Sequence, residues 1–391
     1  MWKLNEKLYS WASILDDQAR AQAELTAGLS FVQPHVALMP DAHPGMGSTV
    51  GSVIPTVDAI IPAAVGVDIG CGMVAVRTQF TADQLRQQSR GLSYLREQIE
   101  RAIPLSPGRY NRKEWGTAPE AIATLEKLAR EYDVKPEDFG KNWRVQLGSL
   151  GGGNHFIEVT ADEEDNIWAF LHSGSRGVGN QIARRFIRQA KDLAHQKSRE
   201  LSDFDLSYLA EGDPGYEEYL NHLHWAQEFA RLNREVMMDR VLDQTGRYMD
   251  EDIQRREAVN CHHNYTAQEK HFGEKLWVSR KGAIAAHTGV RGLIPGSMGT
   301  ASYVVTGKGN EMSLCSAPHG AGRQYSRTEA RRKFSHDDLR GQMGDIEYRD
   351  LPAFIDEIPS AYKDIDVVMR DSEELVVIDH TLRQLVNVKG Q

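Results

Sequence analysis

Apolar residues recur at helical spacing in four stretches of the chain. The four predicted helices span residues 81–103, 119–132, 181–201 and 216–242. The first opens with Thr81, a residue type that caps helix N-termini, and Gly91 is a point at which this helix can be interrupted. In the last helix the large apolar side chains are expected to belong to the core rather than to a cofactor site: Trp225, Phe229, Met237 and Met238.

Short apolar runs next to glycine-rich segments form the second pattern. Residues 53–55, 74–76 and 168–170 are such runs, and they predict strands that feed loops. Glycine is concentrated at residues 45–51, 66–72, 148–153, 174–179, 296–299, 307–309 and 320–322. Loops of this kind carry much of the binding and catalytic chemistry of proteins, so the candidate functional residues are sought there. No fixed-period repeat is present, which argues against solenoids and propellers.

Composition narrows the class of protein. The chain has 391 residues, of which 40% are hydrophobic and 26% charged, so it has ample material for a core. The formal net charge is −9, so any nucleic-acid partner must be bound by a local basic surface. Two basic runs, residues 184–188 and 331–333, are interpreted first as solvated helix faces.

Cysteine usage and hydropathy predict a cytoplasmic protein. Cys71, Cys261 and Cys315 are too few and too scattered for a disulfide framework, which favours a reducing compartment. The N-terminal residues lack the apolar core of a signal peptide. No uncharged apolar stretch reaches the roughly 18 residues that a membrane helix needs, so no membrane partner is expected.

The glycine-rich segment 66–72 presents a carboxylate, Asp68, and a thiol, Cys71, three residues apart. On such a turn both side chains can point to one centre, and a thiolate can bridge two metal ions. The alternative is that Cys71 is a small buried hydrophobic residue, a common role for free cysteine.

Histidines at strand ends supply further candidate ligands. Alternation along the segment entered at Gly153 places Asn154, Phe156 and Glu158 on one face and His155 on the other. His172 follows the apolar run 168–170 and is expected at the end of a strand.

His262 and His263 are adjacent, so a strand can direct only one of them inward. Three histidines, an aspartate and a cysteine can fill two open metal sites. The thiolate suits zinc, while carboxylate and imidazole also suit manganese or iron, so the residue types leave the metal open. The candidates fall at 68–71, 155–172 and 263, and a shared site requires these segments to converge. We therefore expect one compact α+β domain over residues 1–391; the resemblance given below implies mixed β-sheets flanked by helices around a central metal cleft.

His319 lies in a small, glycine-rich loop, with Arg323 four residues further on. Gly320 and Gly322 leave the imidazole approachable and let backbone N–H groups face an anion. Such an imidazole can attack phosphorus and form a phosphoramidate. The alternative is a turn histidine without a catalytic role.

Taken together and in this order, the motifs resemble those of the RtcB family of 3′-phosphate/5′-hydroxyl RNA ligases. The resemblance covers most of the chain. Its motifs are residues 40–45, 62–72, 151–156, 172–177, 294–299, 319–323 and 389–390.

The resemblance implies an α+β fold with a central metal cleft that binds two Mn²⁺. It implies that Cys71 bridges both ions, that Asp68 and His263 complete one of them, and that His155 and His172 complete the other. It further implies that GTP is the cofactor and that His319 becomes guanylylated.

The resemblance also implies a guanosine nucleotide pocket. Its expected residues are Asn154, His155, Phe156, Ile157, Glu158, His263, Asn264, Pro295, Gly296, Ser297, Met298, Ser302, His319, Gly320, Ala321, Gly322 and Lys389, with Asp41 and Tyr362 as further pocket residues. Glu158 is expected to read guanine, because a carboxylate can accept hydrogen bonds from both N1–H and the exocyclic amino group, a pair that adenine lacks.

The activity implied is ligation of an RNA 3′-phosphate, or a 2′,3′-cyclic phosphate, to a 5′-hydroxyl through an RNA–ppG intermediate. The setting is tRNA splicing or RNA repair, with RNA contacts around Arg176 and Arg323. Some members of the family use a small activator protein, archease. The alternatives are a dinuclear phosphatase or nuclease without a covalent nucleotide, and a metal-binding structural or RNA-binding module without GTP chemistry.

Overall fold

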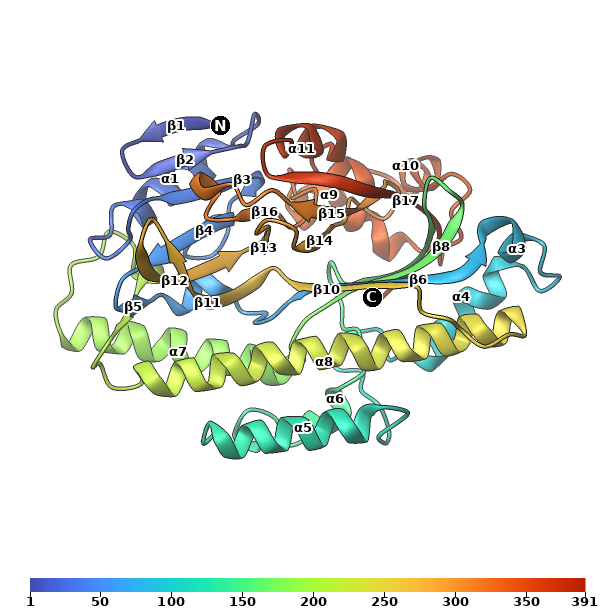
Figure 1. Cartoon of the computed structure of the whole chain (residues 1–391), viewed down its shortest axis with the longest axis horizontal. Helices are drawn as coiled ribbons and strands as arrows, with labels where there is room; N and C mark the ends of the chain where they lie inside the picture. Colours follow the sequence, from blue (N-terminus) through green and yellow to red (C-terminus); the bar gives the residue numbers. More distant parts are fainter. Residues whose placement is uncertain (391) are drawn as a thin grey trace.

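Two antiparallel-rich sheets form the centre of the molecule (Figure 1). The computed structural model describes residues 1–390, so residue 391 of the expected domain lies outside the described residues. The six-stranded sheet has the order β1 (Trp2–Asn5), β2 (Leu8–Ser10), β3 (Val36–His43), β4 (Val50–Thr56), β12 (Glu274–Lys281) and β11 (Asn264–His271). The seven-stranded sheet has the order β10 (Glu257–His262), β6 (Gly72–Thr81), β8 (Asn166–Ser173), β7 (Phe156–Ala161), β17 (Val376–Lys389), β15 (Ser302–Gly307) and β14 (Arg291–Ile294).

Two short ribbons accompany the large sheets, and helices cover them. The ribbons are β13 (Ala283–Ala285) with β16 (Ser316–Pro318) and β5 (Ala59–Ile60) with β9 (Leu209–Ala210). The helices are α1 (Asp17–Ala27), α2 (Pro62–Val65), α3 (Ala82–Arg86), α4 (Gly91–Ala102), α5 (Ala118–Glu131), α6 (Trp143–Gln146), α7 (Arg176–Gln196), α8 (Tyr216–Met249), α9 (Arg327–Lys333), α10 (His336–Met343) and α11 (Ile365–Asp371). Short 3₁₀ turns are η1 (Pro136–Asp138), η2 (Phe204–Leu206), η3 (Glu311–Ser313), η4 (Pro352–Glu357) and η5 (Pro359–Ala361).

Helix α8 lies between the seven-stranded sheet and other helices. It contacts β6, β8 and β10 on one side and α5 and α7 on the other, and α7 runs beside it in Figure 1. A helix that is packed on several sides must be apolar around much of its circumference. The expected core positions Trp225, Phe229, Met237 and Met238 are indeed buried.

The predicted helices are confirmed, with shifted ends. Thr81 caps α3 through a capping box. The predicted helix is interrupted after Arg86, and Gly91, which has φ 70°, begins the second helix, α4. Helix α7 begins at Arg176, earlier than the expected residue 181, because the glycine-rich stretch 174–179 is mostly helical rather than a loop. Helix α8 continues to Met249, beyond the expected residue 242.

The apolar runs 53–55, 74–76 and 168–170 lie in β4, β6 and β8, so the predicted strands are confirmed. The basic runs 184–188 on α7 and 331–333 on α9 contain exposed arginines, as expected of solvated helix faces. All three cysteines are free. Among residues 1–390, none of the helices combines the length and apolarity that a membrane span requires.

Candidate active site

Neighbouring strands of the seven-stranded sheet bring the candidate residues to one edge. β10, β6, β8, β7 and β17 are adjacent and antiparallel, so the end of one strand lies beside the start of the next. The register pairs Gly72 with Ser173, and Phe156 with both His172 and Lys389. Residues that are far apart in the sequence, but that start or end these strands, therefore meet at a single edge.

The loop before β6 is shaped by glycine. Gly66 and Gly70 have φ values of 87° and 69°, a region that glycine adopts without strain. A Cβ on Gly70 would lie 2.8 Å from the Ala230 side chain and 2.9 Å from the Gln227 backbone, so α8 packs directly against the loop. This tight turn places Asp68 and Cys71 on the same side of the loop, as the sequence predicted.

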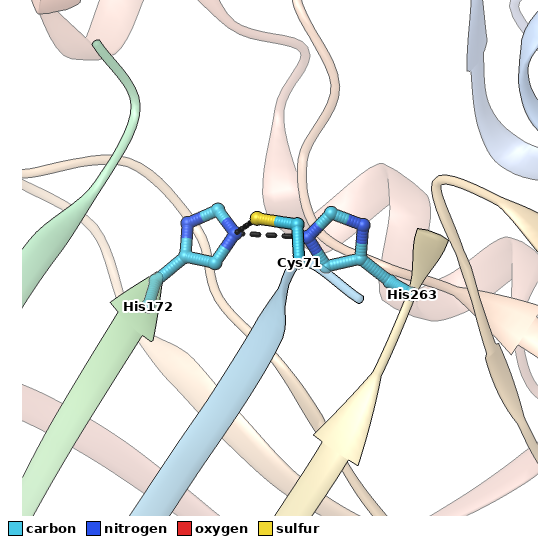
Figure 2. Close-up of side chains that lie close together, drawn as sticks. All are labelled: Cys71, His172 and His263. Atoms are coloured by element: carbon cyan, nitrogen blue, oxygen red, sulfur yellow. Dashed lines mark hydrogen bonds between the residues drawn. The ribbon is translucent and has the colours of Figure 1, made fainter. Parts of the chain in front are cut away.

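The five expected metal ligands form one cluster, in which the cysteine and the histidines are buried and Asp68 is partly exposed. Cys71 Sγ lies 3.4 Å from His155 Nε2 and 3.3 Å from His172 Nε2. His155 Nε2 lies 3.0 Å from Asp68 Oδ2, and His172 Nε2 lies 2.8 Å from His263 Nε2. Figure 2 shows Cys71 between His172 and His263, each coming from a different strand end. His262 turns away and its Nδ1 lies 2.8 Å from the Gly70 carbonyl, so only one of the adjacent histidines joins the cluster.

The cluster divides differently from the division that the resemblance implied. Cys71, His172 and His263 form one convergent group, and Asp68, Cys71 and His155 form the other. Asp68 therefore goes with His155, and His263 with His172. The reason is the sheet order: β10, which ends just before His263, and β8, in which His172 is the last residue but one, lie on either side of β6. Cys71 alone belongs to both groups, as expected of a bridging ligand.

Each ligand histidine has its Nδ1 beside an acceptor oxygen. Nδ1 of His155 lies 2.9 Å from the Leu150 carbonyl, Nδ1 of His172 lies 3.1 Å from the Asn154 carbonyl, and Nδ1 of His263 lies 3.2 Å from the Asn264 side-chain oxygen. Because a carbonyl only accepts, Nδ1 carries the proton and Nε2 keeps its lone pair for a metal. Burial also lowers the pKa of His172 and of His263 well below the usual range, which keeps both imidazoles neutral.

His319 follows β16 and is oriented by Asp41. Its Nδ1 lies 2.6 Å from Asp41 Oδ2, and the same oxygen accepts hydrogen bonds from the backbone N–H groups of His319 and Gly320. The ring lies 4.8 Å from that of His263, centroid to centroid. Nδ1 is buried beside the carboxylate, so Nε2 is the nitrogen available for nucleophilic attack.

A cavity of about 370 Å³ joins His319 to the metal cluster. Most of the expected nucleotide residues line it, and they are Asn154, Phe156, His263, Asn264, Pro295, Gly296, Ser297, Met298, His319, Gly320, Ala321, Gly322, Tyr362 and Lys389. Its volume falls within the range of small-molecule sites. Arg323 lines it as well, whereas Arg176 does not and donates from Nε to Ser149 Oγ at 3.1 Å.

Five expected pocket residues lie behind this lining: Asp41, His155, Ile157, Glu158 and Ser302. Ile157 points to the opposite face of β7, where it joins the apolar core. Glu158 is buried, with its two carboxyl oxygens 3.4 Å from Ser302 Oγ and 3.3 Å from Asn387 Nδ2. Burial raises the pKa of Glu158 to about 8, although Lys389 and these donors oppose the shift.

Two charged residues of this region were not among the sequence candidates. Glu357 in η4 is buried and accepts a hydrogen bond from Lys389 Nζ at 3.0 Å and from the Tyr362 hydroxyl at 2.5 Å. Lys281 lines the cavity and donates to the Ser48 and Ala63 carbonyls at 2.9 and 3.2 Å. The one sequence signal was at Lys281, where two adjacent cations, Arg280 and Lys281, end an apolar strand.

Sequence comparison with known proteins covers all the residues of this site. A family model described as "tRNA-splicing ligase RtcB" matches residues 22–390. The chain is 45% identical, over 98% of its length and 97% of the relative's, to "RNA-splicing ligase RtcB" of Escherichia coli K12. It is 30% identical to "RNA-splicing ligase RtcB2" of Escherichia coli ATCC 25922, over 91% of this chain and 87% of the relative. It is 29% identical to "tRNA-splicing ligase RtcB" of Nanoarchaeum equitans, over 96% and 92% of the two chains.

Proposed function

The chain belongs to the RtcB family of tRNA-splicing ligases and is an RNA ligase, and we propose that it joins RNA 3′-phosphate ends to 5′-hydroxyl ends with GTP and Mn²⁺. The observation that supports this most is the position of His319. One cavity contains this imidazole, two of the histidine ligands and most of the expected nucleotide residues. A nucleophile, a metal cluster and a nucleotide-sized space are thus in one place.

The donor set fits two divalent ions. Cys71, His172 and His263 would hold one, and Asp68, Cys71 and His155 the other. When bound, such ions neutralise charge on phosphate oxygens and align an in-line displacement. The thiol and imidazoles suit several transition metals, so Mn²⁺ is proposed from family membership.

The first step assigned to this chain belongs to His319. Its Nε2 attacks the α-phosphorus of GTP, forming a P–N bond while the bond to the bridging oxygen breaks and pyrophosphate leaves. Asp41, at 2.6 Å from Nδ1, holds the ring and stabilises the positive charge that the imidazole acquires. His319 then carries GMP as a phosphoramidate.

Transfer and joining complete the reaction. An oxygen of the RNA 3′-phosphate attacks the same phosphorus, the P–N bond breaks, and an RNA–ppG end results. The RNA 5′-hydroxyl then attacks the RNA phosphate, loses its proton to solvent or a base, and displaces GMP. A 2′,3′-cyclic phosphate must first add water to give a 3′-phosphate and a 2′-hydroxyl.

We propose that guanine is read at the Glu158 end of the cavity. Glu158, Ser302 and Lys389 are close together there, and Phe156 provides an apolar ring that lines the space. An ionised Glu158 would accept both guanine N–H donors. Asn154, whose carbonyl lies 3.1 Å from Nδ1 of the metal ligand His172, is assigned to the phosphate end of the nucleotide.

The alternative, a dinuclear phosphatase or nuclease, does not explain the position of His319. Hydrolysis needs metal ligands but no nucleophilic imidazole held by a carboxylate, and the family assignment does not favour it. A cytoplasmic location and an archease-type activator remain predictions of the sequence.

The chemistry of the RNA ends that the enzyme accepts tests the proposal. Purified enzyme with Mn²⁺ and GTP should join RNA strands that carry 3′-phosphate and 5′-hydroxyl ends. The same strands with 3′-hydroxyl and 5′-phosphate ends are the matched control and should not be joined. Joining of the control strands, or joining without GTP, would contradict the proposed chemistry.

A further inference from the structure

An open groove of about 1060 Å³ lies outside the metal cleft. It is formed by residues 100–117, which include the end of α4 and the loop before α5, together with residues 236–247 of α8. It shares no lining residue with the cavity that contains His319. None of the motifs that carry the family resemblance contributes to it.

The groove is basic although the chain is acidic overall. Six arginines line it, against Glu100, Asp239 and Asp243. Three of the six pair with carboxylates: Arg101 with Glu97, Arg247 with Asp243 and Arg349 with Glu100. The other three, Arg109, Arg112 and Arg240, form no ion pair with any residue in the part of the chain that the structure describes. A local excess of free cations is the electrostatic feature that nucleic acid binding requires.

Arg240 is the most informative of these cations. Its Nη1 donates to Asn111 Oδ1 at 2.7 Å and to the Gly148 carbonyl at 3.3 Å. Its Nε and Nη2 are buried and have no hydrogen-bond partner among residues 1–390. Arg240 is therefore a half-buried, incompletely hydrogen-bonded cation in the wall of the groove, and it adds positive charge there without exposing these two nitrogens to a ligand.

Aromatic rings accompany the cations. Trp115 lines the groove and is 50% exposed, with Lys113 Nζ 4.1 Å from the centre of its ring. Tyr110 lines the same groove. Cations that follow a phosphate backbone, combined with rings on which bases stack, are the features that bind single-stranded nucleic acid, whereas a small anion would need only the cations.

The groove begins close to the metal cleft. A Cβ on Gly177 would lie 3.5 Å from the Tyr110 hydroxyl, and Ser175, two residues earlier, donates its backbone N–H to Asp68 Oδ1 at 3.1 Å. On another side, a Cβ on Gly390 would lie 2.2 Å from the Leu105 carbonyl. Gly390 follows Lys389 of the cavity wall, so a single layer of residues separates the groove from the cleft.

From these observations we infer that the groove binds a single-stranded arm of the RNA whose end is being joined. Arg109 and Arg112, which are exposed, contact its phosphates, Arg240 adds positive charge to the wall of the groove, and Trp115 and Tyr110 stack on its bases. The inference rests on the proposed function, since it takes RNA as the substrate of the adjacent cleft. It explains how a chain with a net charge of −9 holds a polyanion, because the cations are concentrated in one groove.

RNA binding without GTP tests the inference independently of ligation. The probe is a fluorescent single strand of about 20 nucleotides, longer than one binding site. The variants are Arg109→Ala/Arg112→Ala and Trp115→Ala, which replace exposed residues. The control is Arg184→Ala/Arg188→Ala on α7, which removes the same charge from another exposed face.

The double variant should bind the probe about tenfold more weakly. Its log–log dependence of affinity on salt should become shallower by about 1.4, for two phosphate contacts at roughly 0.7 each. Trp115→Ala should weaken binding by about fivefold or more at unchanged salt dependence, because stacking is not ionic. The α7 control should match the wild type. Wild-type affinity and salt dependence in the double variant, or an equal loss in the control, would overturn the inference.

Strand length provides the second arm of the test. The double variant should join strands of about four nucleotides as well as the wild type does, since these cannot fill both cleft and groove. It should join long strands more slowly and should react with GTP at the wild-type rate. An equal defect for short and long strands would overturn the inference. If the wild type itself forms no adduct with GTP, the proposed function fails, while the binding measurement still decides whether the groove holds RNA.

Discussion

The two ends of the cleft are built on different principles. At the metal end, where Asp68, Cys71, His155, His172 and His263 converge, each histidine donates its Nδ1 proton to an oxygen of the protein, so the rings are oriented before an ion binds. At the nucleotide end, around Glu158, Ser302 and Lys389, burial raises the pKa of Glu158 to about 8. This carboxyl is therefore mostly protonated at neutral pH, and it must lose the proton to accept the guanine N–H groups that we propose it reads. The comparison teaches that the candidate metal ligands are oriented in advance, whereas the guanine recognition that we propose for Glu158 requires this carboxyl to lose a proton when the ligand binds.

Arg234 of α8 is the main support of the metal end. It is fully buried and its Nη1 donates to the carbonyls of Gly70 at 2.7 Å and Ser173 at 3.1 Å, the neighbours of Cys71 and His172. Its Nη2 lies 3.2 Å from His262 Nδ1, beside His263. One guanidinium therefore connects three ligand-bearing segments.

Two buried glutamates on either side of Lys389 characterise the nucleotide end. Burial acts to raise the pKa of Glu357, but Lys389, the Tyr362 hydroxyl and two arginines outweigh it, so the pKa falls below its usual value. Glu158 has weaker partners, and burial raises its pKa to about 8. Glu357 is therefore ionised and structural, whereas Glu158 is the carboxyl whose protonation a bound ligand can change.

The largest expected effect is that of Cys71→Ala. Because Cys71 belongs to both ligand groups, its loss should remove both ions and abolish ligation. His172→Ala, the comparison variant, should mainly lose the ion held with His263. Metal content measured by native mass spectrometry tests this, and two full equivalents retained by Cys71→Ala would contradict an essential bridge.

Arg234→Met should have the second-largest effect, a loss of metal affinity. It keeps the volume of the side chain but leaves the Gly70 and Ser173 carbonyls without their donor, so metal affinity should fall by about 10–100-fold. Arg231→Met, on the same helix, half-buried and paired with Glu228 and Glu235, is the control. Titration with Mn²⁺ measures both, and thermal melting of the metal-free proteins checks that they fold. Unchanged affinity in Arg234→Met would show that the ligands need no such support.

Glu158→Ala should leave the metal end intact and weaken the nucleotide end. Charge-assisted hydrogen bonds contribute roughly 1.5–3 kcal/mol each, so GTP affinity should fall by at least about tenfold. Adduct formation measured against GTP concentration, with ATP as competitor, gives both affinity and selectivity. If affinity for GTP and preference over ATP are both unchanged, guanine is read by other residues.

The last prediction is a pH dependence at the nucleotide end, for which each single step of pH changes affinity least. Glu158 must lose its proton to accept the guanine N–H groups, so with a pKa of about 8 the GTP affinity should rise with pH and level off above pH 8. Below pH 8 the change should approach tenfold per pH unit. Calorimetry in a His319→Ala background isolates binding from chemistry. Glu158→Gln should flatten the dependence, and an unaltered slope in that variant would assign the proton to another group.

Local patterns in the sequence predicted the parts of this site but not their pairing. The strand ends at His172 and Phe156 and the turn at Cys71 could be predicted because alternation and glycine act over a few residues. The division of the five ligands into two groups could not be predicted, because it depends on β6 lying between β8 and β10 in the sheet. Arg234 and Glu357 were missed because each acts across the fold from a segment without a glycine-rich motif. The helical start at Arg176 was missed because glycines there pack in a helix.

The central claim is that His319 carries the nucleotide, and labelling with GTP tests it most directly. Wild-type enzyme incubated with Mn²⁺ and α-labelled GTP should retain label through denaturing electrophoresis. The bond should be labile in acid and stable in base, as expected of a phosphoramidate. His319→Ala should fold, bind metal and remain unlabelled. Persistent labelling of His319→Ala, or RNA joining by the wild type without any labelled enzyme, would contradict the account.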